Sequence, residues 1–178
     1  MGVKGIKLFK NDHIISISIL SHIDVTSAEA KAYLKLVTVN KKTDKEREEI
    51  DKILKEDKSE NIKLSSDRFD EMKAREQFIL TITENGYGKR TSSFQFRISN
   101  RGGSGIMCIN TSERNGNVLA SFPVGNDDDI MLITKEGQLI RCPVKDVRIA
   151  GRSTQGVSIF KTSEGEKVVS ASRVEIES

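Results

Sequence analysis

The chain has 178 residues, of which 36% are apolar and 31% charged, with no tryptophan and a formal net charge of +3. This composition suits one ordinary domain or a few repeat units, and no apolar run reaches the roughly 18 residues that would indicate a membrane span. The start of the chain lacks the pattern of a secretory signal. Its two cysteines, Cys108 and Cys142, are too far apart for a C-x-x-C motif. The sequence therefore predicts a reduced cytosolic protein without a disulfide, zinc site or membrane segment.

Residues 1–20 match the back half of a unit that recurs later in the chain. Gly2 is followed twelve residues later by apolar Ile14, just as Gly156 is followed by Val168. Self-similarity of this kind is typical of repeat architectures. We interpret this first element as the closing part of one repeat unit.

Residues 21–76 interrupt the repeat and are predicted to be a helical insertion. Thr26 and Thr43 each precede a glutamate by three residues, which is the capping-box pattern of a helix start. The apolar residues that indicate a second and a third helix are Ile50, Ile53, Leu54, Phe69 and Met72. The insertion holds 13 basic and 14 acidic residues, whereas the rest of the chain holds 16 and 12, so the positive excess lies outside it.

Residues 77–125 and 126–178 are predicted to be two complete units of the same kind. Gly86 and Gly137 are 51 residues apart, and each ends an apolar run with a turn that is typical of a β-hairpin. Each unit reads as four short strands, which is the signature of a propeller blade. The expected fold is therefore all-β with a helical insertion, forming an open arc of about two and a half propeller-like blades.

The candidate binding residues are basic and recur at equivalent positions of the repeat. They are Lys4, Lys7, Lys89, Arg90, Arg101, Arg141 and Arg152. A surface of regularly spaced cations beside glycine turns suits the phosphates of duplex DNA, because neutralising phosphates releases counterions. The sequence contains no groove-reading helix, so binding without sequence specificity is expected. A solvated basic surface remains the alternative interpretation of these residues.

Other polar residues do not suggest a catalytic or metal site. His13 and His22 are isolated, and Asp127-Asp128-Asp129 reads as a charged turn rather than a calcium site. No nucleophile–base pair or paired carboxylates stand out. We therefore predict no enzyme active centre, cofactor site, metal site or small-molecule substrate in this chain.

Three segments closely resemble the C-terminal domain of the DNA gyrase A subunit. They are Glu84–Thr91, then Ile130–Thr134 with Gly137–Arg141, and Gly151–Val157. The resemblance covers about 120 residues, everything outside the insertion. It implies the terminal blades of a β-pinwheel, in which neighbouring blades exchange strands. The implied function is wrapping of duplex DNA in support of negative supercoiling by an ATP-dependent type II topoisomerase.

The same resemblance implies that several functional features of the family lie outside this chain. Arg101, Gly102, Gly103 and Gly105 keep only the core of the family's gyrase A box, so this turn is a degenerate copy. Tyr33 and Tyr87 are not expected to be the strand-cleaving tyrosine. ATP and magnesium would bind other parts of the whole enzyme. The expected partners, at the nucleoid, are duplex DNA, the gyrase B subunit, and the rest of the gyrase A subunit.

Two alternatives stay open at this point. The similar domain of topoisomerase IV has the same architecture. A propeller-like protein-interaction module with an incidentally basic surface would also fit the repeat, with the helical insertion as its contact.

Overall fold

The computed structural model describes residues 2–40, 63–163 and 165–174 of the chain. These residues form two compact units, one comprising residues 1–20 with 77–178 and the other residues 21–76. The capping box expected at Thr43 and the helical face expected at Ile50, Ile53 and Leu54 lie outside the described residues.

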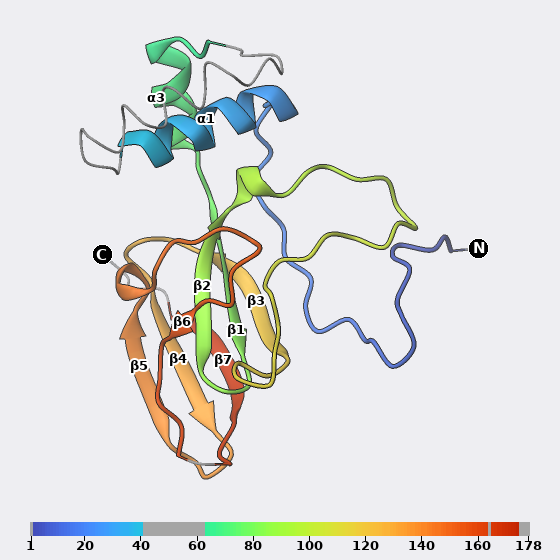
Figure 1. The fold of residues 1–178 in the computed structure, drawn as a ribbon, viewed down its shortest axis with the longest axis vertical. Helices are drawn as coiled ribbons and strands as arrows, with labels where there is room; N and C mark the ends of the chain where they lie inside the picture. Colours follow the sequence, from blue (N-terminus) through green and yellow to red (C-terminus); the bar gives the residue numbers. More distant parts are fainter. Residues whose placement is uncertain (1, 41–62, 164, 175–178) are drawn as a thin grey trace. The chain divides into compact units, whose positions relative to one another are not determined.

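The larger unit contains two antiparallel sheets (Figure 1). The first sheet has the strand order β3 (Val118–Val124), β1 (Phe78–Thr83), β2 (Tyr87–Ser92) and β6 (Val157–Ser158). The second has the order β5 (Leu139–Pro143), β4 (Asp129–Thr134) and β7 (Val168–Val174). The 3₁₀ helices η1 (Ser93–Gln95) and η2 (Val144–Asp146) follow β2 and β5.

The two sheets repeat each other in their details. The pairing of β1 with β3 shifts register between Ile82 and Thr83, and the pairing of β4 with β7 shifts between Ile133 and Thr134, 51 residues later. The two 3₁₀ helices are also 51 residues apart. The predicted mostly-β fold built from a repeated blade unit is thus confirmed.

The core of this unit contains apolar side chains from both sheets. Leu80 and Ile82 of β1 are fully buried together with Ile130 and Leu132 of β4. The remaining buried members of this cluster are Val124, Val144, Val147 and Val168. Burial of such side chains contributes about 1.5–3 kcal/mol each, so packing between the sheets is a main source of stability.

The first sheet takes β6, one of its two outer strands, from the following repeat unit (residues 126–178). β6 pairs with β2 through Tyr87↔Ser158 and Gly88↔Val157. A Cβ at Gly156, next to β6, would stand 2.7 Å from Gly88 O of β2, so glycine permits this close approach of the two backbones. The first sheet is therefore not built from one contiguous unit of four strands, because the following unit supplies this strand.

Residues 2–20 contain no helix or strand. Their backbone lies beside the loop that follows η1, as Figure 1 shows. Gly102 N donates to Gly5 O at 2.7 Å, and Lys7 N donates to Gly103 O at 2.8 Å. Further along, Ser16 Oγ donates to Ser121 O at 2.9 Å, in β3, the other outer strand of the first sheet. These hydrogen bonds attach the N-terminal segment to the repeat unit of residues 77–125.

The smaller unit contains helices α1 (Ser27–Asn40) and α3 (Ser66–Ala74). At the start of α1, Thr26 N donates to Glu29 Oε2 at 2.8 Å and Glu29 N donates to Thr26 Oγ1 at 3.2 Å, which is the predicted capping box. The rings of Tyr33 and Phe69 pack with their centroids 5.1 Å apart. Met72 is fully buried, so the weak apolar pattern of α3 does correspond to a packed helix face.

Acid should weaken the helical unit through Glu29. Hydrogen bonds from the backbone and hydroxyl of Thr26, and then from Arg68, lower the pKa of Glu29 from 4.5 to about 2. A carboxyl group whose pKa is lower in the folded state stabilises that state above its unfolded pKa, and loses this effect as the pH falls through its folded pKa. The helical circular-dichroism signal should therefore decline between pH 4.5 and 2. The helical signal of the Glu29→Gln variant should decline less over this interval. If the acid titrations of the variant and the unchanged chain superimposed, the Glu29 carboxylate would not stabilise the helical unit.

Candidate nucleic-acid interface

Three segments of the larger unit carry basic residues without any acidic ones. They are residues 2–11, the first basic loop (97–110) and the second basic loop (148–161). The two loops occupy the same place in the repeat, 51 residues apart. Their cations and those of residues 2–11 are Lys4, Lys7, Lys10, Arg97, Arg101, Arg148, Arg152 and Lys161. In a chain with 26 acidic residues, such acid-free segments create a locally positive surface.

Glycines shape the first basic loop. Gly102 and Gly105 have positive φ angles of 78° and 74°, which non-glycine residues rarely adopt. The loop's backbone hydrogen bonds to residues 5 and 7 bring Lys4, Lys7 and Arg101 onto adjoining segments. All three side chains are exposed. The degenerate box turn thus forms backbone hydrogen bonds with the N-terminal segment, and three of the predicted cations lie on these two paired segments.

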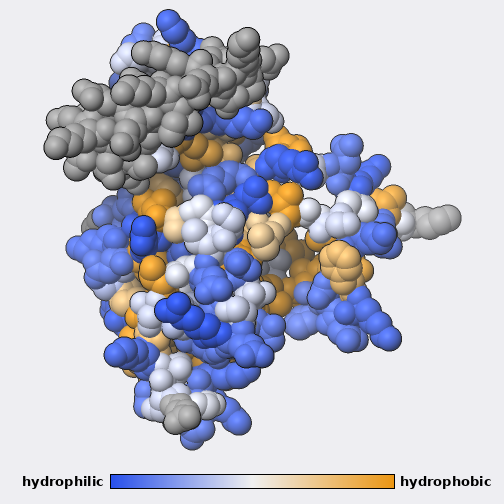
Figure 2. All heavy atoms as spheres, in the orientation of Figure 1, coloured by the Kyte–Doolittle hydropathy of each residue, from blue (hydrophilic) through white to orange (hydrophobic). Residues whose placement is uncertain are grey.

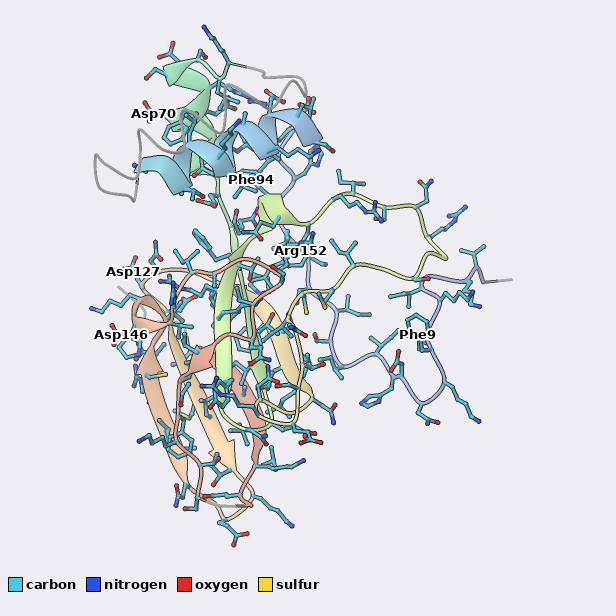
Figure 3. The ribbon with its side chains drawn as sticks, in the orientation of Figure 1. Phe9, Asp70, Phe94, Asp127, Asp146 and Arg152 are labelled. Carbon is cyan, nitrogen blue, oxygen red and sulfur yellow. The ribbon has the colours of Figure 1, made fainter. Side chains whose placement is uncertain are left out.

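The second basic loop adjoins the first. Arg152 Nη1 donates to Met107 O at 2.8 Å, and Asn110 N donates to Thr154 O at 3.1 Å. Arg152 N also donates to Gln95 Oε1 at 3.1 Å. In Figure 3, Arg152 lies on the side of the sheets that faces Phe9, while Asp127 and Asp146 lie on the other side. These hydrogen bonds place residues 2–11 and the two basic loops next to one another, and we call the three segments the basic edge. Its second loop begins at Arg148, two residues after Asp146.

Lys89 lies beneath the second basic loop and is fully buried. Its Nζ donates to Gly151 O at 2.6 Å, Arg152 O at 2.9 Å and Thr154 O at 3.0 Å, and it contacts Thr154 Oγ1 at 3.2 Å. We call this group of oxygens the ammonium site. Burial, and to a lesser degree the nearby Arg152, lower the pKa of Lys89 to about 8. The side chain therefore holds the loop of the next repeat unit.

Arg90 plays a similar part on the same strand. It is 6% exposed, and Nε donates to Val147 O at 2.7 Å while Nη1 donates to Asn126 Oδ1 at 2.6 Å. Its guanidinium also lies 5.8 Å from the centre of the Phe78 ring. The expectation that Lys89 and Arg90 lie on an exposed rim differs from the structure, because the following repeat unit covers both side chains.

The remaining predicted cation, Arg141, is exposed but paired. Its Nε donates to Asp129 Oδ2 at 2.6 Å, next to the acidic turn of residues 127–129. The structure does not bring it together with the basic loops. The candidate cations that sequence reasoning missed are Lys10, Arg97, Arg148 and Lys161. The recurrence of Arg97 at Arg148, 51 residues later, was a signal that could have found two of them.

Both tyrosines of the chain are hydrogen-bonded to charged side chains. Tyr87 Oη accepts a hydrogen bond from Arg114 Nε at 3.1 Å, and Tyr33 Oη donates to Glu76 Oε2 at 2.8 Å. Burial raises the pKa of Tyr33, so its hydroxyl stays protonated. The described residues contain no group of three or more His, Cys, Asp or Glu able to hold a metal ion. Nor does any described helix have the length and apolar character to cross a membrane.

The repeated blades and their basic loop edge define a propeller-type repeat protein. The model of the DNA gyrase C-terminal domain, a β-propeller family, matches residues 1–21, 77–124 and 128–175. The chain therefore belongs to the DNA gyrase A C-terminal domain family. The match leaves out the helical insertion.

Two curated relatives support this assignment. The DNA gyrase A subunit of Rickettsia felis is 44% identical and that of Rickettsia bellii is 43% identical, each over 97% of this chain. The chain spans 18% and 19% of these two relatives, less than a fifth of their length. Because the alignments cover nearly the whole chain, both relatives extend across the insertion as well.

Solved structures give the same architecture. The DNA gyrase A C-terminal domain aligns with a TM-score of 0.51 and 27% identity, over 54% of this chain and 33% of that one. The C-terminal domain of DNA topoisomerase IV aligns with a TM-score of 0.52 and 22% identity, over 56% and 31%. The second likeness concerns the fold alone.

Proposed function

We propose that this chain binds and wraps duplex DNA without sequence specificity, as the C-terminal part of a DNA gyrase A subunit that supports negative supercoiling. The observation that carries the proposal is the acid-free basic edge formed by residues 2–11 and the two basic loops. Cations along an edge can follow a bent phosphate backbone, and backbone neutralisation requires no base contacts.

In this proposal the chain contributes binding and geometry, while strand cleavage occurs elsewhere. Its partners, in the cytoplasm at the nucleoid, are duplex DNA, the gyrase B subunit, and the rest of the gyrase A subunit. ATP and magnesium serve other parts of the enzyme. This chain binds no cofactor, membrane or small-molecule substrate.

Neutralising the first basic loop and the N-terminal segment should weaken DNA binding and its dependence on salt. The variant carries Lys4→Gln, Lys7→Gln, Arg97→Gln and Arg101→Gln, all at exposed positions. Each lost phosphate contact lowers the slope of log affinity against log salt by about 0.9, so a decrease of about 3 to 4 is expected. Gel-shift titrations of a long duplex at several salt concentrations measure this slope.

A matched control removes four exposed lysines that belong to none of the basic segments. Lys31→Gln, Lys63→Gln, Lys73→Gln and Lys135→Gln change the net charge by the same amount. If both variants lose affinity equally, net charge rather than this edge drives binding. Wrapping is tested by relaxing a plasmid with a nicking-closing enzyme in the presence of the chain, where a changed linking number is expected. Absence of DNA retardation at low salt would favour the protein-interaction alternative.

A further inference from the structure

The N-terminal segment presents Phe9 at the start of a tight turn formed by residues 9–12. Phe9 N donates to Asp12 Oδ2 at 3.2 Å, and Asp12 N donates to Phe9 O at 3.2 Å. Between them, Asn11 has a φ of 73° and is the one non-glycine residue with a positive φ in the described part of the chain. Asparagine tolerates this conformation because its short side chain is polar. Two hydrogen bonds thus fix the backbone that carries the Phe9 side chain.

Two turns of the same kind occur at this place in the later repeat units, 51 residues apart. Ser112 N donates to Asn115 Oδ1 at 2.7 Å, and Ser163 N donates to Glu166 Oε2 at 3.3 Å. The first residue of the turn is therefore serine in both later copies and phenylalanine in the N-terminal one. Because serine forms the turn as well, the turn does not require an aromatic ring. Phe9 is also 71% exposed, so the core does not require it either.

Cations lie on both sides of Phe9. Lys7 and Lys10 are exposed and belong to a segment without acidic residues. The next acid along the chain, Asp12, uses a carboxylate oxygen to accept Phe9 N. Lys7 N donates to Gly103 O at 2.8 Å, which joins this segment to the first basic loop. Figure 3 shows Phe9 apart from both sheets, and Figure 2 shows hydrophobic spheres interspersed with hydrophilic ones over the N-terminal segment. An exposed aromatic ring therefore lies among the cations of the basic edge.

An apolar side chain between cations suits the minor groove of a bent duplex. Proteins that kink DNA insert apolar side chains between base pairs from the minor groove. Cations beside the inserted side chain contact phosphates and hold the protein in position on the duplex. Unstacking one base step costs free energy, which is recovered because the kinked duplex contacts more of the protein. The fixed turn, the exposed ring and the two lysines together meet these requirements.

We propose that Phe9 is an apolar wedge that inserts between two base pairs from the minor groove and kinks the wrapped duplex. Lys7 and Lys10 contact the phosphates on either side of it. This inference rests on the proposed function, since it places Phe9 on DNA that the basic edge binds. Pyrimidine–purine steps such as TA unstack easily, so the wedge gives an otherwise sequence-independent surface a preference for a flexible step. Serine in the two equivalent turns confines the kink to the N-terminal turn among the three.

The test measures unstacking and affinity separately on a short duplex that carries 2-aminopurine at one central TA step. The fluorescence of this base should rise at least about twofold on saturation with the unchanged chain, and equally with Phe9→Leu, which keeps an apolar wedge. Phe9→Ser installs the residue of the equivalent turns and should abolish the rise. Its salt dependence of binding should stay unchanged, because no phosphate contact is removed. Leu139→Ala removes a side chain that is 60% exposed on β5, outside the basic edge, and should behave like the unchanged chain.

The possible failures are distinct from one another. If the unchanged chain does not retard the duplex at low salt, DNA binding fails and the wedge fails with it. If the chain binds but its fluorescence rise is absent, or is the same for Phe9→Ser, the wedge is wrong while DNA binding stands. Self-association that Phe9→Ser abolishes, detected by sedimentation without DNA, would assign Phe9 to a protein contact instead.

Discussion

Replacing Lys89 with methionine should destabilise the larger unit by about 3 kcal/mol. The substitution keeps the volume of the buried stem but leaves the carbonyls of Gly151, Arg152 and Thr154 without their donor. Each buried acceptor left without a partner costs about 1–3 kcal/mol, and Thr154 Oγ1 offsets part of this by its hydrogen bond to Gly151 O. Urea unfolding followed by circular dichroism measures the loss.

A surface lysine provides the control for this prediction. Lys167 Nζ pairs with Glu84 Oε2 at 2.8 Å, but its side chain is 54% exposed. Exposed ion pairs contribute little, so Lys167→Met should change the unfolding free energy by no more than about 0.5 kcal/mol. Lys89→Met should also speed hydrogen exchange of Thr154 and its neighbours in the second basic loop. If the two variants were equally stable, Lys89 would not hold this loop.

The burial of Lys89 shows that recurrence in a sequence does not decide whether a basic side chain is exposed or buried. Basic residues at one place in the repeat predict a common function only when their side chains share an environment. The next repeat unit surrounds Lys89 and Arg90 with carbonyls, and this surrounding comes from strand exchange, which local pattern does not specify. One signal was present, since Ile140 stands 51 residues after Lys89. A position that accepts isoleucine is more compatible with burial than with a phosphate contact.

Features fixed by backbone conformation were predictable. Gly86 and Gly137, 51 residues apart, lie in the turns of equivalent hairpins, where each has a positive φ. Their spacing was enough to predict two equivalent sheets. The capping box at Thr26 was predictable for the same local reason. Residues 2–20 match the repeat in sequence but contain no strand. A strand requires a partner, so the pattern of a single segment cannot guarantee one.

Gly86 and Gly137 offer the most direct test of strand exchange between the units. They occupy the same place in the repeat and have φ angles of 76° and 83°. Gly86 O accepts hydrogen bonds from Ile159 N at 2.9 Å and Phe160 N at 3.2 Å, and a Cβ at Gly86 would collide with Phe160 O. A Cβ at Gly137 would enter open space. The two glycines therefore share the strain of an alanine substitution but not the contact with the next unit.

Alanine at Gly137 should cost about 1 kcal/mol, the strain of a left-handed alanine. Alanine at Gly86 should cost about 3 kcal/mol, because the same strain is joined by displacement of β6 and loss of about 1 kcal/mol for each of two hydrogen bonds. Urea unfolding gives both free energies, and only Gly86→Ala should speed hydrogen exchange of the Ile159 and Phe160 amides. Equal losses for the two variants would mean that the contact between β2 and the following unit adds no stability. A larger loss at Gly86 would instead show that the blades are stabilised by the strand they exchange.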